Sequence, residues 1–285
     1  MNRLFFVWIF CFTTFLFAGE KLTVAVTLAP YANIVRAIAG DKMDVLTLVP
    51  SNANPHTFEP KPAVLKKFAE ASVYFSDGSG MDKAWMPRFK GVNPKIRIAE
   101  LSAGISWLYE EHEDHEGHED GPELDPHLWN SPRQVILISS NICSTLVEMD
   151  PANAGFYRTN LEAFNKKMTQ LDLEFSNRIN ALPVEKRTFI VFHPSYGYLA
   201  RDYGLTQIAV EMDGKEPKPR DLANLVREAK EHHVSTVFVQ PQFSRRAAES
   251  LSREIKAKIV SIDPLAYDFE ANLKFFLKTL AGEAK

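Results

Sequence analysis

Residues 151–182 read PANAGFYRTNLEAFNKKMTQLDLEFSNRINAL and contain no glycine after Gly155 and no internal proline. Large apolar residues recur at intervals mostly of two to four, at Phe156, Leu161, Phe164, Met168, Leu171, Leu173, Phe175 and Ile179. The pattern predicts one helix of about 25 residues, spanning close to 40 Å at about 1.5 Å per residue. Pro151 suits a helix start, and Pro183 marks its end.

Short β-branched segments alternate with helical patterns on both sides of this stretch. Four precede it, LTVAVT (22–27), MDVLTLV (43–49), SVYFS (72–76) and KIRIA (95–99), and four follow it, RTFIVFH (187–193), LTQIAVE (205–211), STVFVQ (235–240) and AKIVSID (257–263). Such alternation is typical of βαβ units with parallel sheets. We therefore predict an α/β fold with an N-terminal lobe over 20–150, a linking helix over 151–182 and a C-terminal lobe over 183–285. A rigid helical link predicts small lobe motions.

The N-terminus has the pattern of a secretory signal peptide. Arg3 precedes an almost unbroken apolar run over 4–17, which the small residues Ala18 and Gly19 follow. The run is shorter than the roughly 20 residues that a membrane-spanning helix requires. We predict cleavage after about residue 19 and export to the periplasm. Cys143 is then the sole cysteine of the mature chain, in an apolar helical pattern that predicts a core position.

Composition excludes some classes of partner. The chain has 285 residues, 45% of them apolar, and a formal net charge of -3. This composition is typical of a globular protein. The small negative net charge gives the chain no general attraction for nucleic acid or anionic membranes. We expect a monomer that binds no nucleic acid.

Three histidines lie beside prolines at the edges of apolar stretches: His56 in NPHTFEP, His127 in DPHLWN and His193 in VFHPSYG. Asp263, in VSIDPLA, likewise follows a strand-like segment. Ligands of open α/β sheets bind beyond the carboxyl ends of the strands, so two residues from each lobe would meet in the cleft between the lobes. Three imidazoles and one carboxylate make a tetrahedral zinc set. Each histidine also fits an ordinary loop position with backbone hydrogen bonds, and spacing alone does not decide.

Two glutamates near these residues are candidates for orienting a ligand imidazole. Glu59 follows His56 by three positions, and it also suits the start of the next helix. Glu211 follows a strand-like segment, where it can line the cleft or cap an element.

The segment EEHEDHEGHED (110–120) has histidines at every third position, His112, His115 and His118, and no large apolar residue. It cannot bury enough apolar surface to order itself, so we predict a mobile loop over 110–123. The three histidines predict weak, exchangeable metal binding, and the alternative is a solvated run of charge.

Five segments carry a resemblance to a known family: PHTFEPKP (55–62), DPHLW (125–129), FHPSYGYLARDYGL (192–205), GKEPKPRDLANLV (214–226) and IDPLA (262–266). Together they resemble the cluster 9 substrate-binding proteins of metal ABC transporters, the ZnuA and TroA type, over essentially the whole mature chain. The resemblance implies that His56, His127, His193 and Asp263 are the four metal ligands, and that the histidine-rich segment is the variable insertion of zinc-binding members.

Two positions bear on the choice of metal. Some zinc-specific members place a glutamate directly before the first ligand histidine, whereas this chain has Pro55, so Asp263 or water is expected as the fourth ligand. Some manganese-specific members replace the third histidine with glutamate, whereas this chain keeps His193, which favours zinc.

The resemblance implies a periplasmic protein that captures zinc and delivers it to an ABC transporter permease with its ATPase. A manganese-carrying homologue is the alternative of the same type. An exported zinc-dependent hydrolase is less favoured, because four ligands leave no open position for a catalytic water and no paired general base is evident. Ser195 lies outside a G-x-S-x-G motif. A surface adhesin would need an anchor, which the sequence does not offer.

Overall fold

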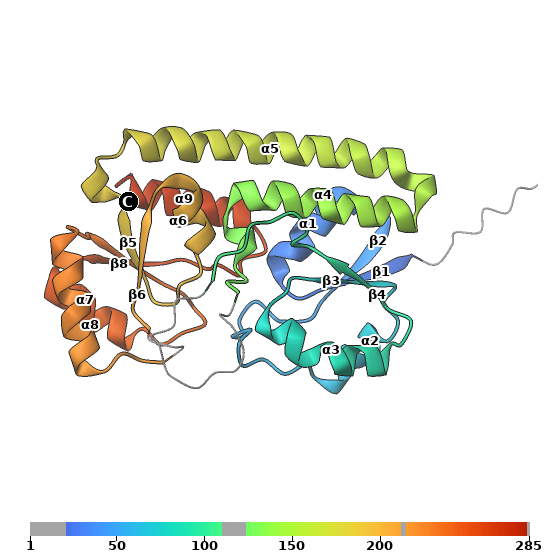
Figure 1. Ribbon diagram of the computed structural model, residues 1–285, viewed down its shortest axis with the longest axis horizontal. Coiled ribbons are helices and arrows are strands. Elements are labelled where there is room, and N and C mark those ends of the chain that lie inside the picture. The colour runs from blue at the N-terminus through green and yellow to red at the C-terminus, as the bar shows by residue number, and fades with distance from the viewer. Residues whose placement is uncertain (1–20, 110–123, 212–214, 284–285) are drawn as a thin grey trace, which may run out of the picture.

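The computed structural model describes residues 21–109, 124–211 and 215–283. The predicted signal peptide and the three histidines at 112, 115 and 118 lie outside the described residues. Two α/β lobes sit side by side in Figure 1. No helix of the described part is both long and apolar enough to cross a bilayer.

Each lobe contains a parallel four-stranded sheet. The N-terminal lobe is built from β1 (Leu22–Val26), α1 (Ala29–Ala39), β2 (Met43–Thr47), α2 (Pro62–Phe68), β3 (Val73–Ser76), α3 (Gly80–Val92) and β4 (Arg97–Glu100). The C-terminal lobe is built from β5 (Thr188–Val191), α6 (Gly197–Tyr203), β6 (Thr206–Ala209), α7 (Pro219–Glu231), β7 (Thr236–Val239), α8 (Arg246–Ile255), β8 (Lys258–Ser261) and α9 (Phe269–Leu280). The strand orders, β2-β1-β3-β4 and β6-β5-β7-β8, repeat one arrangement. The predicted two-lobe α/β fold is confirmed.

The predicted linking helix is also confirmed. After α4 (Pro132–Met149), helix α5 (Ala154–Ala181) runs for 28 residues, or about 42 Å. Figure 1 shows it crossing both lobes above α4 and α9. One stripe of α5 is buried, Tyr157, Phe164, Met168, Leu171, Phe175 and Ile179. Their spacing of three, four or seven is helical, whereas Leu173 points outward and is 55% exposed.

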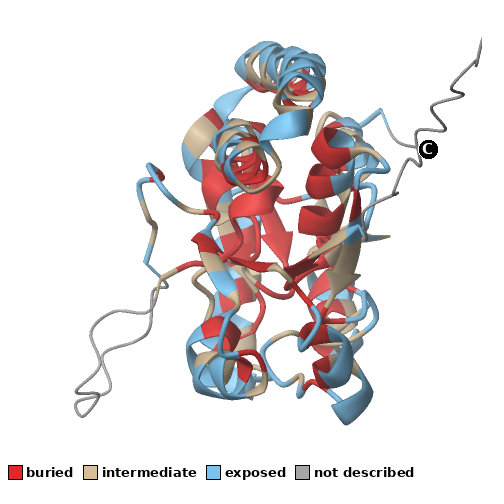
Figure 2. Ribbon diagram, turned by 90° about the vertical axis from the view of Figure 1, so that its right-hand side faces the viewer, coloured by how far each residue is buried: buried red, intermediate tan, exposed pale blue. Residues whose placement is uncertain are grey.

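One apolar core runs through both lobes beneath α5. It contains Val26 and Phe75 from the first sheet, Phe238 and Leu273 from the second lobe, and Phe175 from α5. A second, smaller core lies between the second sheet and α7 and α8. Figure 2 shows the buried residues on the strands and on the inward faces of the helices. Separating the lobes would expose the shared core to water, which opposes wide motion.

Two carboxylates are buried where β3 ends. Asp82, near the start of α3, accepts hydrogen bonds from the Tyr74 hydroxyl, Ser76 Oγ at 2.5 Å and the Asp77 backbone N–H at 2.8 Å. Asp77 accepts one bond through Oδ1, from the Ser79 backbone N–H at 3.0 Å. Its Oδ2 is buried and has no hydrogen-bond partner among the described residues. Burial, followed by repulsion from Asp82, raises the pKa of Asp77 to about 7.

Asp77→Asn is expected to stabilise the protein in a pH-dependent way. The pKa of Asp77 is raised from 3.8 to about 7, so the folded state binds more protons than the unfolded state between these values. The free energy of unfolding therefore falls as pH rises, and the full destabilisation from ionised Asp77 is reached above about pH 7. The variant lacks this cost, so its free energy of unfolding should exceed that of the natural protein by about 1–3 kcal/mol at pH 8 and hardly at all at pH 4.

Urea unfolding at both pH values measures this difference. Asp44→Asn, at an exposed position of β2, is the matched control and should change stability little at either pH. An equal effect of Asp77→Asn at pH 4 and pH 8 would contradict the assignment.

Candidate metal centre

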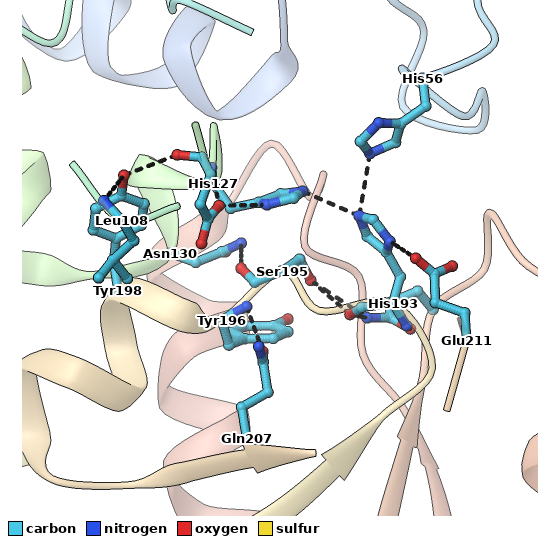
Figure 3. A network of polar contacts seen from close by, with 12 residues as sticks. His56, Leu108, His127, Asn130, His193, Ser195, Tyr196, Tyr198, Gln207 and Glu211 are labelled. Carbon is cyan, nitrogen blue, oxygen red and sulfur yellow. Dashed lines mark hydrogen bonds and ion pairs between the residues drawn. The ribbon is translucent and has the colours of Figure 1, made fainter. Parts of the chain in front are cut away.

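Three histidines from distant parts of the chain meet between the lobes. His56 lies in the loop between β2 and α2, His127 immediately precedes the short helix Leu128–Asn130, and His193 follows β5 after one residue. His193 Nε2 is 3.1 Å from His56 Nε2 and 3.1 Å from His127 Nε2. Figure 3 shows the rings pointing toward one another. Within the described ranges, this is the one group of three or more His, Cys, Asp or Glu residues with ligand atoms within 4.8 Å of each other.

The backbone at His193 is held by a neighbouring strand. Gln240, which follows β7, accepts a bond from the His193 N–H at 3.1 Å and donates one from Nε2 to the His193 carbonyl at 2.7 Å. Because β5 and β7 are parallel neighbours, their carboxyl ends lie together. The side-chain amide of Gln240 therefore fixes the backbone of His193 at the edge of the sheet that faces the cleft. The ring of His193 also stacks on Phe243, with centroids 4.8 Å apart.

A carboxylate lies behind each of the two buried histidines. Asp125 Oδ1 is 2.7 Å from His127 Nδ1, and Glu211 Oε1 is 2.7 Å from His193 Nδ1. A carboxylate at Nδ1 accepts the ring proton there and leaves Nε2 as a bare lone pair. Two such lone pairs 3.1 Å apart repel each other unless a cation or a proton lies between them. The arrangement is chemically suited to a metal ion.

The carboxylate of Asp125 is a feature that the sequence analysis missed. Its signal was present in DPHLW, because an aspartate two residues before a histidine can bond both the backbone and the ring. Asp125 Oδ1 does so here, since it also accepts the His127 backbone N–H at 2.9 Å. Glu211 occupies the ring-orienting place that was one of its two predicted roles.

His56 is held differently. It is exposed on its loop, and its backbone N–H donates to Asn54 Oδ1 at 2.9 Å. Loss of hydration on the side facing the cleft, followed by repulsion from His193 and His127, lowers the pKa of His56 to about 3. Burial also lowers the pKa of His193, although the hydrogen bond that its Nδ1 donates to Glu211 opposes this shift. Both rings are neutral at pH 7 and need release no proton to bind a metal.

The other predicted residues lie around this group without joining it. Asp263 follows β8 as expected, and its Oδ1 accepts bonds from Gln242 Nε2 at 2.8 Å and the Leu265 N–H at 3.0 Å. Its carboxylate is not within the 4.8 Å group. Glu59 is exposed, and Lys61 occupies the N-cap position of α2 without a side-chain capping hydrogen bond.

The cavity at the histidines is small. Its volume is about 50 Å³, and its walls include Leu28, Met81, Trp129, Phe243 and Pro264 beside the three histidines. Sites for organic ligands usually measure about 300–1,000 Å³. This cavity has room for an ion and a few waters, and its apolar walls strengthen electrostatic interactions inside it.

Comparisons with known proteins identify the family of the chain. Residues 24–282 match the family model for ZnuA, the periplasmic component A of the zinc-uptake complex. The chain is 33% identical to the high-affinity zinc uptake system protein ZnuA of Bacillus subtilis (strain 168), over 87% of this chain and 79% of that protein. It is 30% identical to the manganese ABC transporter substrate-binding lipoprotein PsaA of Streptococcus mitis, over 85% of this chain and 79% of that protein.

A solved structure shows the same architecture. The crystal structure of ZnuA superposes with a TM-score of 0.86 and 36% identity, covering 93% of this chain and all of the other. These relatives are solute-binding proteins and not enzymes, which removes the hydrolase alternative. The chain belongs to the ZnuA family of periplasmic metal-binding proteins, the binding component of ABC transporters for zinc or manganese.

Proposed function

We propose that this protein captures Zn²⁺ with His56, His127 and His193 and delivers it to the permease of an ABC transporter. The convergence of three Nε2 atoms on one point, two of them backed by carboxylates, is the observation that carries this proposal. Asp263 or a water is the fourth ligand. We also propose that residues 1–19 are cleaved on export. The lobes then comprise residues 20–150 and 183–285.

The ligand set favours zinc over manganese. Imidazole nitrogen suits zinc, whereas manganese prefers carboxylate, carbonyl and water oxygen. Manganese remains the second candidate, because a relative as similar as PsaA of Streptococcus mitis is named for manganese. Any nitrogen-rich site binds zinc more tightly than manganese in vitro. Metal analysis of protein taken from its own periplasm, without added metal, therefore decides between the two ions.

One prediction of this proposal concerns the three histidine ligands. His193→Ala should lower zinc affinity by about two orders of magnitude or more, because it removes the ring that contacts both other histidines. Deletion of residues 111–120 should change the affinity little, because the segment is proposed to gather the ion weakly. Calorimetric titration of both variants measures this. An unaffected His193→Ala protein would refute the site.

The second prediction concerns protons. Metal binding releases protons only from ligands that are protonated beforehand. The pKa of His56 is lowered to about 3 and that of His193 is lowered from its ordinary value, so both rings lose their proton at a lower pH than a free imidazole does. Zinc affinity should therefore decline at a lower pH than the usual imidazole pKa near 6.5 would give. Calorimetry at pH 6.5 in two buffers of different ionisation enthalpy should show less than about one proton released per zinc ion. Release of two or more would count against this site.

The third prediction concerns the two carboxylates. Asp125→Asn and Glu211→Gln keep side-chain volume but remove the negative charge from Nδ1 of the ligand rings. Each should weaken zinc binding by about 10–100-fold. Asp221→Asn, in the first turn of α7, is the matched control and should bind as the natural protein does. If Asp125→Asn and Glu211→Gln bind zinc as tightly as the Asp221→Asn control, the carboxylates do not orient ligand rings.

A further inference from the structure

The lobes are joined by two unequal sets of hydrogen bonds. Around the start of α4 the bonds are many, among them Trp129 Nε1 to the Pro264 carbonyl at 2.6 Å, Asn130 Nδ2 to the Ser195 carbonyl at 2.8 Å and Gln134 Nε2 to Asp202 Oδ2 at 2.7 Å. The loop over residues 48–57, which carries His56, has far fewer. In the described part of the chain it reaches the C-terminal lobe through the His56–His193 contact and one other bond, from Gln242 Nε2 to the Ser51 carbonyl at 2.9 Å.

Gln242 makes two bonds with the same nitrogen. Besides the Ser51 carbonyl, its Nε2 donates to Asp263 Oδ1 at 2.8 Å. Both acceptors carry only lone pairs, so the opposite amide orientation would place Oε1 against a carbonyl and a carboxylate. The two contacts therefore fix the orientation. Oε1 is left buried, without a hydrogen-bond partner among the described residues, and Gln242 lines the cavity of the three histidines.

The fold explains how one side chain reaches both partners. Strands β7 and β8 are parallel neighbours, with Val239 paired to Ser261. Gln242 and Asp263 follow these strands by three and two residues, so both leave the sheet at the same edge. This edge faces the loop of the N-terminal lobe.

We propose that Gln242 is a latch between the lobes that positions two metal ligands at once. It holds His56 through the Ser51 carbonyl of its loop, and Asp263 through Oδ1, which leaves Oδ2 as the oxygen for an ion. The proposal rests on the proposed function, because it takes His56 and Asp263 as ligands. His56 is the exposed ligand on the loosely held loop, so an ion that leaves must first lose this ring, and the latch slows that step.

The variant for the test is Gln242→Leu, which keeps approximate size and removes both bonds. Gln134→Leu is the matched control, because it makes the same change at another amide that bonds across the junction, to Asp202, and does not bond the His56 loop or Asp263. Hydrogen exchange of the metal-free proteins is the first measurement. Amides in residues 48–57 should exchange about five- to tenfold faster in Gln242→Leu and at the natural rate in Gln134→Leu.

Zinc dissociation into excess chelator is the second measurement. Gln242→Leu should release zinc about tenfold faster, and Gln134→Leu should release it at the natural rate. The double variant Asp263→Asn with Gln242→Leu should increase the zinc dissociation rate by less than the product of the two single increases, because the two side chains share one hydrogen bond.

Unchanged exchange in residues 48–57 of Gln242→Leu, or an unchanged dissociation rate, overturns the latch. So does an equal response of Gln134→Leu. Failure of the proposed function is recognised separately, by zinc affinity that survives His193→Ala, because the exchange measurement uses protein without metal.

Discussion

The hydrogen bonds that the Nδ1 atoms of His127 and His193 donate to Asp125 and Glu211 are the interactions on which the site depends. Without them, either ring could place its proton on Nε2 and turn a lone pair into a donor. With them, two acceptors face each other at 3.1 Å inside a cavity of about 50 Å³. The fold sustains this unfavourable contact because it fixes both rings from behind, and a cation relieves it.

Much of the architecture could be predicted because its signals are local. The apolar recurrence over residues 151–182 follows helical periodicity, and eight short β-branched segments alternate with helices. Parallel strands place their carboxyl ends at one edge, so His193 and Asp263 were expected at the cleft from strand assignment alone. The shared core could not be predicted, because the sequence does not show that Phe238 and Phe75 contact one cluster.

The details of the site depended on side-chain geometry, which the sequence does not specify. Glu59 and Glu211 both had a plausible place behind a ligand ring, but one is exposed and the other reaches Nδ1 of His193. Asp125 does not follow a strand-like segment, so the strand-end pattern did not predict its role, and it reaches the His127 ring from two residues earlier in the chain. The sequence around Gln242 did not predict its role, because a glutamine after a strand is common and its two acceptors are known only from the structure.

The shared core and the uneven junction constrain how an ion enters. Wide separation of the lobes would expose Phe175 and its neighbours beneath α5, so access by large hinge opening is costly. Among the described residues, the loop at 48–57 has two polar contacts with the opposite lobe, and the apolar residues it buries, Leu48 and Val49, lie at its start. Opening the part of this loop that carries His56 would break these two contacts and leave the shared core closed, so we expect it to cost less free energy than separating the lobes. In the proposed site, His127 and His193 would then form the fixed half, and His56 would be the ligand that arrives last.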